Sequence, residues 1–392
     1  MKKVFVIIML AVAFDVCAQQ PHYAEILKAV EANNPMLLAA QKHAEARQVA
    51  AKVGVLLQDP EVEAAYFWGD PAEIGIRWDL SVSQTFEMPS VLVRRARLRD
   101  LEQQAANLDY QVARNKIFYE AQQTCADYIY YSAVAEILDN RATTAARLAQ
   151  LYQKRFDAGD CSILEYNRAQ MYLAQAQREV SEARFDVQQT RSSLFTLAGD
   201  AAFAFGQKEY DNIVLPLDFD AWYQQFEMNN PSLRMLDNQV SEGELRSKLS
   251  RAQWLPSISV GYASENIVGE TFRGVKVGLS LPIWSQQRAA RQADLEQQAA
   301  QQELVAQRDK LARDLLCLLQ HMRTLQSNLD NLRSVYDKCN SLALLDKALE
   351  AGEINLEQYL VQADYYVDIQ LQIWQLARQL EQAYLQLNSI TL

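Results

Sequence analysis

Apolar and polar residues alternate over two stretches of the chain, one in each half. Apolar residues fall on even positions between Glu73 and Phe86 and on odd positions between Phe272 and Ile283. A period of two predicts β-strands with one apolar and one polar face. A weaker alternation precedes each stretch, so each half is expected to contain two strands. The expected strands cover about residues 61–68, 74–86, 257–267 and 272–283.

Two other segments lack the residues that break helices. Ser90–Leu197 and Ser285–Leu392 contain no proline and one glycine each, Gly159 and Gly352. Because proline and glycine disfavour helix interiors, each segment is expected to form a long helical hairpin with its glycine at the tip. The first helix would extend for about 100 Å. Its apolar residues recur at the spacing of a coiled-coil seam: Leu98, Leu101, Ala105, Leu108 and Val112.

An internal repeat relates the two halves. Asn34-Pro35 recurs as Asn230-Pro231 at an offset of 196 residues. Further matches, at offsets of 193 to 197, are Tyr66 with Tyr262, Val82-Ser83 with Leu279-Ser280, Asp100–Ala106 with Asp294–Ala300, and Ala158-Gly159-Asp160 with Ala351-Gly352-Glu353. This ordered series predicts a duplicated unit of helix, strand, strand, long helix and helix. The expected parts are a first repeat over 19–198, a linker over 199–229 and a second repeat over 230–392.

The first residues, 1–18, have the pattern of a secretory signal peptide. Met1-Lys2-Lys3 is basic, residues 4–14 form an apolar run, and Val16-Cys17-Ala18 fits a cleavage site. Lipidation at Cys17 is an alternative. The apolar run is too short to cross a bilayer, and no longer run follows, so an exported chain without a transmembrane helix is expected.

Charge and composition limit the classes of function. The net charge is −11 and no basic block exists, which argues against nucleic acid as a partner. The three histidines are far apart, and no nucleophile, phosphate-binding or metal-binding motif is present, so we expect no enzyme activity, cofactor or metal site. Four cysteines follow the expected signal peptide without a CxxC pair and are expected to be free thiols: Cys125, Cys161, Cys317 and Cys339.

The alternating strands fit either a soluble sandwich or an outer-membrane barrel. Their length and the nearby Trp68, Trp78 and Trp284 favour the barrel, in which aromatic residues line the membrane interfaces. Four strands cannot close a barrel, and lipid does not tolerate open strand edges. Two copies would supply eight strands around a filled interior, whereas three copies would supply 12 strands around an open lumen.

Together these features resemble the TolC-like outer-membrane efflux protein family, the outer membrane factors. The resemblance covers roughly residues 22–390 and rests on the duplicated order, the two Asn-Pro pairs and the Ala-Gly-acid tips. It implies a mainly α fold with a small β part, in which a homotrimer forms a 12-stranded outer-membrane β-barrel continuous with a long periplasmic α-helical tunnel. It also implies outer-membrane lipid, a periplasmic adaptor (membrane fusion) protein and an inner-membrane efflux pump as partners.

In this family the hairpin tips form the periplasmic entrance and contact the adaptor. The resemblance places these contacts at Ala158, Gly159, Asp160, Ala351, Gly352 and Glu353. It also makes Arg155 and Tyr359 candidates for contacts that hold the entrance shut, and Asp157 and Glu357 candidates for an acidic entrance. Glu357 could contribute to the family's ring of aspartates, but Gln358 and Val361 interrupt the pattern of that ring. A simple helix cap is an alternative role for each glycine.

The implied function is that of a passive conduit, which exports small molecules or ions from the adaptor and pump to the outside. Two alternatives remain open at this point: the outer-membrane channel of a type I protein secretion system, and a non-channel periplasmic coiled-coil scaffold. The sequence does not distinguish drug, metal-ion or protein cargo, and its three His and eight Met give no sign of a metal relay.

Overall fold

The computed structural model describes residues 23–53, 57–200, 205–281, 286–339 and 341–389 of the 392-residue chain. The expected signal peptide, with Cys17, and Trp284 lie outside the described residues. The chain forms two compact units. The first contains Met1–Asn34, Phe118–Val214 and Leu325–Leu385, and the second contains Pro35–Ile117, Leu215–Thr324 and Gln386–Leu392.

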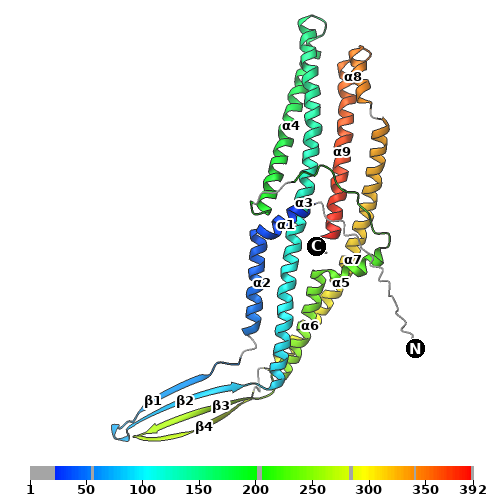
Figure 1. The fold of residues 1–392 in the computed structure, drawn as a ribbon. Helices are drawn as coiled ribbons and strands as arrows, with labels where there is room; N and C mark the ends of the chain where they lie inside the picture. The colour runs from blue at the N-terminus through cyan, green and yellow to red at the C-terminus, as the bar shows by residue number, and fades with distance from the viewer. Residues whose placement is uncertain (1–22, 54–56, 201–204, 282–285, 340, 390–392) are drawn as a thin grey trace, which may run out of the picture. The chain divides into compact units, whose positions relative to one another are not determined.

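Two runs of elements follow one another in the same order (Figure 1). The first run is α1 (Ala24–Asn33), α2 (Pro35–Val53), β1 (Glu61–Trp68), β2 (Ile76–Phe86), α3 (Pro89–Asp157) and α4 (Ile163–Leu197). The second is α5 (Phe219–Asn229), α6 (Pro231–Ala252), β3 (Ser257–Ile267), β4 (Glu270–Ser280), α7 (Gln286–Cys339), α8 (Leu342–Glu350) and α9 (Leu356–Asn388). The duplicated, mainly helical fold with a small β part is therefore confirmed.

Three elements differ from the expected pattern. β4 covers Glu270–Ser280 rather than 272–283. β2 begins at Ile76 rather than 74, because Ala72–Ile74 forms a short 3-10 helix. The long first arm of the second hairpin is interrupted: α7 ends at Cys339 and α8 begins at Leu342. The hydroxyl of Ser341 donates a hydrogen bond to the Cys339 carbonyl over 3.2 Å. Short polar side chains that bond nearby backbone in this way compete with helix continuation.

The repeated Asn-Pro pairs mark the junctions between the paired helices α1–α2 and α5–α6. The side-chain oxygen of Asn230 accepts hydrogen bonds from the amides of Ser232 and Leu233 at 2.9 and 3.2 Å. Pro231 occupies the first helical position, where a missing N–H costs nothing. Asn34 is also buried, and its amide donates to the Leu197 carbonyl over 2.8 Å. Each pair therefore ends one helix and starts the next.

The strands form one antiparallel sheet in the order β1-β2-β3-β4 (Figure 1). β1 and β4 are its edges, and each has a single strand neighbour within the described part of the chain. Among the described residues, no helix is both long and apolar enough to cross a membrane.

Candidate functional site: the sheet and the hairpin tips

One face of the sheet is apolar and exposed. The strand register brings its side chains into rows, such as Val82 opposite Tyr262 and Tyr66 opposite Trp78. Trp78 is 41% exposed and Trp68 is 79% exposed. The other large members of this face are also exposed: Val62, Ile76, Leu80, Phe86, Ile258, Val260, Val275, Val277 and Leu279. A contiguous apolar surface of this kind marks contact with another apolar phase or partner.

The opposite face of the sheet is polar and concave. A hollow on this side is lined by residues of all four strands, including Glu63, Arg77, Glu265 and Lys276. Lys276 on one edge strand reaches Glu63 on the other over 3.3 Å, so the sheet curves around its polar face. Arg77 pairs with Asp79 at 2.9 Å and also with Glu265. The curvature therefore places polar groups inside and apolar groups outside, as in a barrel wall between water and lipid.

The two hairpin tips share one backbone conformation. At the first tip Gly159 has a φ of +80°, and the Asp160 amide donates to the Arg155 carbonyl over 2.7 Å. At the second tip Gly352 has a φ of +74°, and the Glu353 amide donates to the Ala348 carbonyl over 2.9 Å. This six-to-one bond after a left-handed residue is the Schellman helix end, which glycine adopts without steric cost.

A capping box starts the returning helix at each tip. The Ser162 hydroxyl accepts from the Glu165 amide, while the Glu165 carboxylate accepts from the Ser162 amide over 2.8 Å. At the second tip the Gln358 amide donates to the Asn355 side chain over 2.8 Å, and the Gln358 side chain accepts from the Asn355 amide. Gln358, which interrupts the family's acidic pattern, therefore has a capping role here.

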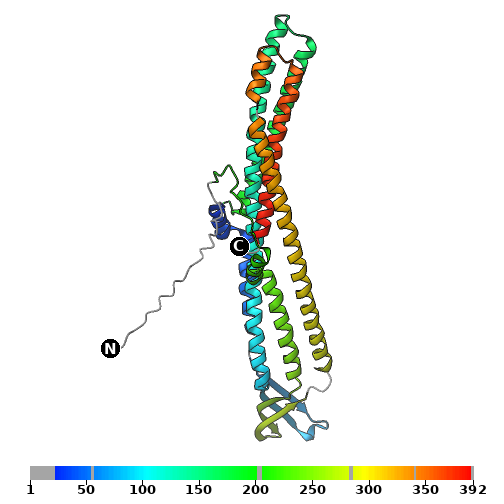
Figure 2. The same ribbon diagram turned by 90° about the vertical axis from the view of Figure 1, so that its right-hand side faces the viewer.

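A hydrophobic cluster joins the two hairpins just behind their tips, within the first unit. Both hairpin tips lie at the same end of the ribbon (Figure 2). The members of the cluster come from α3, α4, α8 and α9: Leu148, Tyr152, Ala169, Leu349, Leu356, Tyr359, Leu360 and Ala363. The hydroxyl of Tyr359 donates to Asp346 over 2.8 Å, and Arg147 pairs with Asp346 at 2.6 Å. Burial, together with the Asp346 carboxylate, raises the pKa of Tyr359, so this hydroxyl stays protonated.

A second polar connection lies further along the same helices. Arg141 of α3 pairs with Glu179 of α4 and with Asp364 of α9, the latter at 2.8 Å. Tyr172 donates to Asp364 over 2.8 Å, and the Arg141 guanidinium lies 5.1 Å from the Tyr172 ring centre. The side chain of Arg141 is only 12% exposed. Burial raises the pKa of Tyr172 to about 12. The two hairpins are thus joined by both apolar and charged contacts.

Solved structures of outer-membrane channels have the same fold. The CmeC channel of Campylobacter jejuni superposes with a TM-score of 0.78, over 95% of this chain and 85% of that chain, at 14% identity. VceC of Vibrio cholerae gives 0.74 over 94% and 95%, at 14% identity. The channel OprN gives 0.80 over 95% and 90%, at 15% identity. The chain has the TolC-like outer-membrane-channel fold. The resemblance predicted by the sequence is confirmed at the level of the fold.

Sequence comparison adds one curated relative. The cobalt-zinc-cadmium resistance protein CzcC of Cupriavidus metallidurans is 26% identical over 224 residues, which are 55% of this chain and 51% of CzcC. The matched part of the chain thus spans about half the length of this relative. No model of a protein family matches the sequence.

In this channel fold, the predicted contact residues lie together at the exposed hairpin ends. Ala158, Gly159, Asp160, Ala351, Gly352 and Glu353 are all exposed. Asp157 is exposed and accepts a hydrogen bond from Gln153 over 3.0 Å. Glu357 is exposed and pairs with Arg168 at 2.9 Å.

The two predicted gate residues have separate partners within the chain. The Arg155 guanidinium lies 5.4 Å from the Tyr152 ring centre, whereas Tyr359 is buried against Asp346. A role of either residue in holding the entrance shut therefore stays a prediction. The residues that join the hairpins here, Arg147 and Asp346, carried no sequence signal because they lie 199 positions apart.

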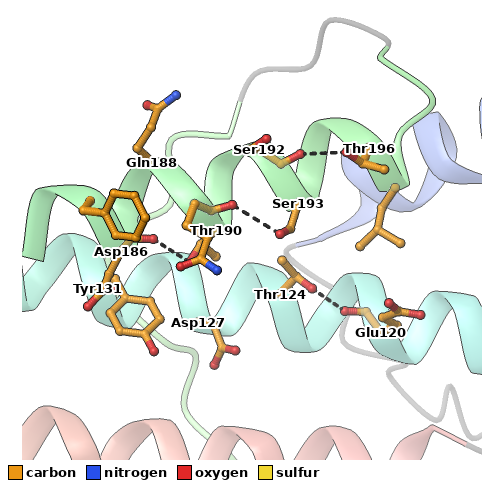
Figure 3. Close-up of a pocket in the computed structure, with 13 residues that line it drawn as sticks. Glu120, Thr124, Asp127, Tyr131, Asp186, Gln188, Thr190, Ser192, Ser193 and Thr196 are labelled. Atoms are coloured by element: carbon orange, nitrogen blue, oxygen red, sulfur yellow. Dashed lines mark hydrogen bonds between the residues drawn. The ribbon is translucent and has the colours of Figure 1, made fainter.

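A polar groove runs between α3 and α4 elsewhere in the first unit (Figure 3). Several of its hydroxyl groups donate hydrogen bonds to carbonyls of their own helices, as Thr124 does to Glu120 and Thr190 to Asp186, both over 2.8 Å. Asp127, on the same groove, accepts from Arg378 over 2.8 Å. These hydroxyl groups and Asp127 therefore already have hydrogen-bond partners within the first unit. The described residues contain no cluster that could hold a metal ion, and the cysteines among them are free.

Proposed function

We propose that the chain is the outer-membrane channel of a tripartite efflux system. The observation that carries the proposal is the sheet, whose exposed apolar face is convex and whose charged face is concave. Because four strands with two open edges cannot stand alone in lipid, the working channel is a homotrimer whose 12 strands close a barrel in the outer membrane. The helices then form a tunnel in the periplasm, and transport through it is passive and involves no enzymatic step.

The partners follow from this architecture. A periplasmic adaptor docks on the hairpin tips and connects the channel to an inner-membrane pump. The exposed small residues Ala158 and Ala351 support this site, because a partner helix can approach the backbone closely there. The tip residues Gly159 and Gly352 shape the loops, while Asp160 and Glu353 supply exposed charge.

Divalent metal cations are the first cargo class to test. The resemblance to a protein named for cobalt, zinc and cadmium resistance supports this choice over drugs or protein cargo. In a wide aqueous tunnel the selection of cargo rests mainly with the pump, so the channel requires no dedicated metal site.

Membrane fractionation and conductance test the central proposal. The processed chain is expected in the outer-membrane fraction, where it runs as a trimer on unheated gels and as a monomer after boiling. The purified trimer should produce discrete conductance steps in planar bilayers. A water-soluble chain without conductance would instead support the periplasmic scaffold.

Cargo is tested in a strain that lacks the gene. Loss of the channel should increase sensitivity to zinc, cobalt or cadmium, and expression of the chain should restore resistance. Sensitivity to drugs alone, or loss of a secreted protein, would move the proposal to another cargo class while leaving the channel itself intact.

Adaptor docking is tested by placing bulk at the tips. Ala351→Arg should abolish co-purification of the adaptor while the trimer and its conductance persist. Ala174→Arg provides a matched control, because Ala174 is an exposed alanine on α4 away from the tip. Equal adaptor binding by both variants would show that Ala351 is not part of the docking site.

A further inference from the structure

The internal repeat extends to the register of the strands. β1 maps onto β3 with an offset of 196 residues, as for Tyr66 and Tyr262, and β2 maps onto β4 with an offset of 197, as for Ser83 and Ser280. In the β-hairpin formed by β1 and β2, Glu61 lies opposite Ser83. These offsets convert that pair into Ser257 opposite Ser280, which is the register of the second hairpin. The β1–β2 and β3–β4 hairpins are therefore equivalent residue by residue.

This equivalence bears on the edges of the sheet. The junction between the repeats is the β2–β3 pairing, in which Ser83 lies opposite Gly261. The proposed function implies a closed ring of copies, and this inference rests on it. In such a ring, β4 of one copy meets β1 of the next. Strand directions alternate across the sheet, so this junction is antiparallel like the β2–β3 junction.

We propose that β4 pairs with β1 of a second copy in the register that the β2–β3 junction prescribes. Adding 197 to Ser83 gives Ser280 on β4, and subtracting 196 from Gly261 gives Ala65 on β1. The pair Ser83 opposite Gly261 therefore corresponds to Ser280 opposite Ala65 of the next copy. The rows of this junction are Val277 with Trp68, Gly278 with Phe67, Leu279 with Tyr66, and Ser280 with Ala65.

The chemistry of the two faces agrees with this register. Leu279 and Val277 belong to the exposed apolar face, as do Tyr66 and Trp68, so each apolar row continues across the junction. A shift by one residue would bring the apolar residues of one copy opposite the polar face of the next.

The position of Phe67 distinguishes this register from shifts by two. Its ring is exposed on the polar face, where the other strands carry mostly small or charged residues. Opposite it the proposed register places Gly278, which leaves room for an aromatic ring on the neighbouring strand. A shift by two residues would instead place Ser280 or Lys276 there.

Cysteine cross-linking in the intact trimer tests the register. The parent chain carries Cys161→Ser, Cys317→Ser and Cys339→Ser, and the test variant adds Ala65→Cys and Ser280→Cys. Oxidation of membranes with copper phenanthroline should shift the monomer band to bands of two and three linked chains on boiled, non-reducing gels. The matched control, Ala65→Cys with Lys276→Cys, has the second cysteine four residues further along the same face and should remain monomeric.

The outcomes separate this inference from the proposed function. Linked chains in the control but not in the test variant would establish a different register and overturn the inference. So would the absence of linked chains from a test variant that still runs as a trimer on unheated gels. If the parent chain forms no trimer, the proposed function itself fails. Reduction should return both variants to the parent's gel pattern.

Discussion

Arg141 connects three helices of the first unit through partners that are themselves partly buried. Its side chain is 12% exposed, and those of Glu179 and Asp364 are 18% and 38% exposed. Arg141→Ala leaves two carboxylates without their cation, and we expect a loss of about 2–3 kcal/mol in the free energy of unfolding. Arg184→Ala is the matched control, because Arg184 and Asp139 are exposed and their pair contributes within about 0.5 kcal/mol. Thermal unfolding of both variants checks the difference, and equal shifts would contradict it.

Glu381 provides a prediction about pH. It is 5% exposed, Tyr23 donates to one carboxylate oxygen over 3.0 Å, and the other oxygen has no hydrogen-bond partner among the described residues. Burial raises the pKa of Glu381 above its usual value of 4.5. The folded state therefore binds this proton more tightly than the unfolded state, and stability falls as pH rises from 4.5 toward the raised pKa.

Glu381→Gln removes this cost while it keeps an acceptor for Tyr23. We expect the variant to be more stable than the parent near pH 8, by about 1–2 kcal/mol, and equally stable near pH 4, where the parent carboxyl is protonated. Thermal unfolding at the two pH values measures this. A destabilised variant at pH 8 would show that the ionised carboxylate is favoured in the folded chain.

At the scale of elements, the two faces of β2 predict opposite tolerance to charge. Val82 lies on the exposed apolar face and Ser81 on the concave polar face. A lysine that faces lipid near the bilayer midplane costs about 2–4 kcal/mol, whereas one that faces a wet lumen costs little. Val82→Lys should therefore reduce the trimer recovered from membranes, and Ser81→Lys should not. Equal yields on unheated gels would argue against lipid contact on this face.

The hairpin tips show how an element limits substitution. Gly159 and Gly352 have positive φ, and an added Cβ would meet no atom within 4 Å at either position. Gly159→Ala should therefore cost about 1–2 kcal/mol through backbone strain alone, and Gly159→Asn less, because asparagine tolerates this conformation. Chemical unfolding measures the order of the three chains. If Gly159→Ala left the stability unchanged, backbone strain at the helix end would not explain why glycine occupies this position.

At the scale of the whole molecule, three copies of each tip would concentrate negative charge at one opening. Asp157, Asp160, Glu350, Glu353 and Glu357 are all exposed there. We expect the trimer to favour cations in a gradient of about 0.1 M KCl, and Asp160→Asn with Glu353→Gln to reduce the reversal potential. Near 1 M salt the difference should vanish, because screening shortens the reach of these charges to about 3 Å. An unchanged reversal potential at low salt would show that these carboxylates are solvated surface groups without a role in cation preference.

Sequence patterns predicted much of the fold. Hydrophobic periodicity and helix-breaking residues determine structure locally, and the repeat was visible as an ordered series of matches. The alternation from Glu73 to Phe86 predicted both faces of β2, and the isolated Gly159 predicted the left-handed helix end. The break before α8 was missed, because it depends on a short polar residue at Ser341 rather than on glycine or proline. Gln358 interrupts the family's acidic pattern in the sequence, whereas its hydrogen bonds with Asn355 give it a capping role in the structure.

The sequence alone determined the duplication, the strand alternation and the glycine tips, since each is encoded in residues near one another or in the order of matches. Only the tertiary structure decided which way the sheet curves and which charged residues join the hairpins. Lys276 and Glu63 are 213 positions apart, and Arg141 and Asp364 are 223 apart. Such contacts depend on how helices and strands approach in space, and a single sequence contains no periodic signal for them. The curvature of the sheet assigned the polar face to the inside, a choice that alternation left open.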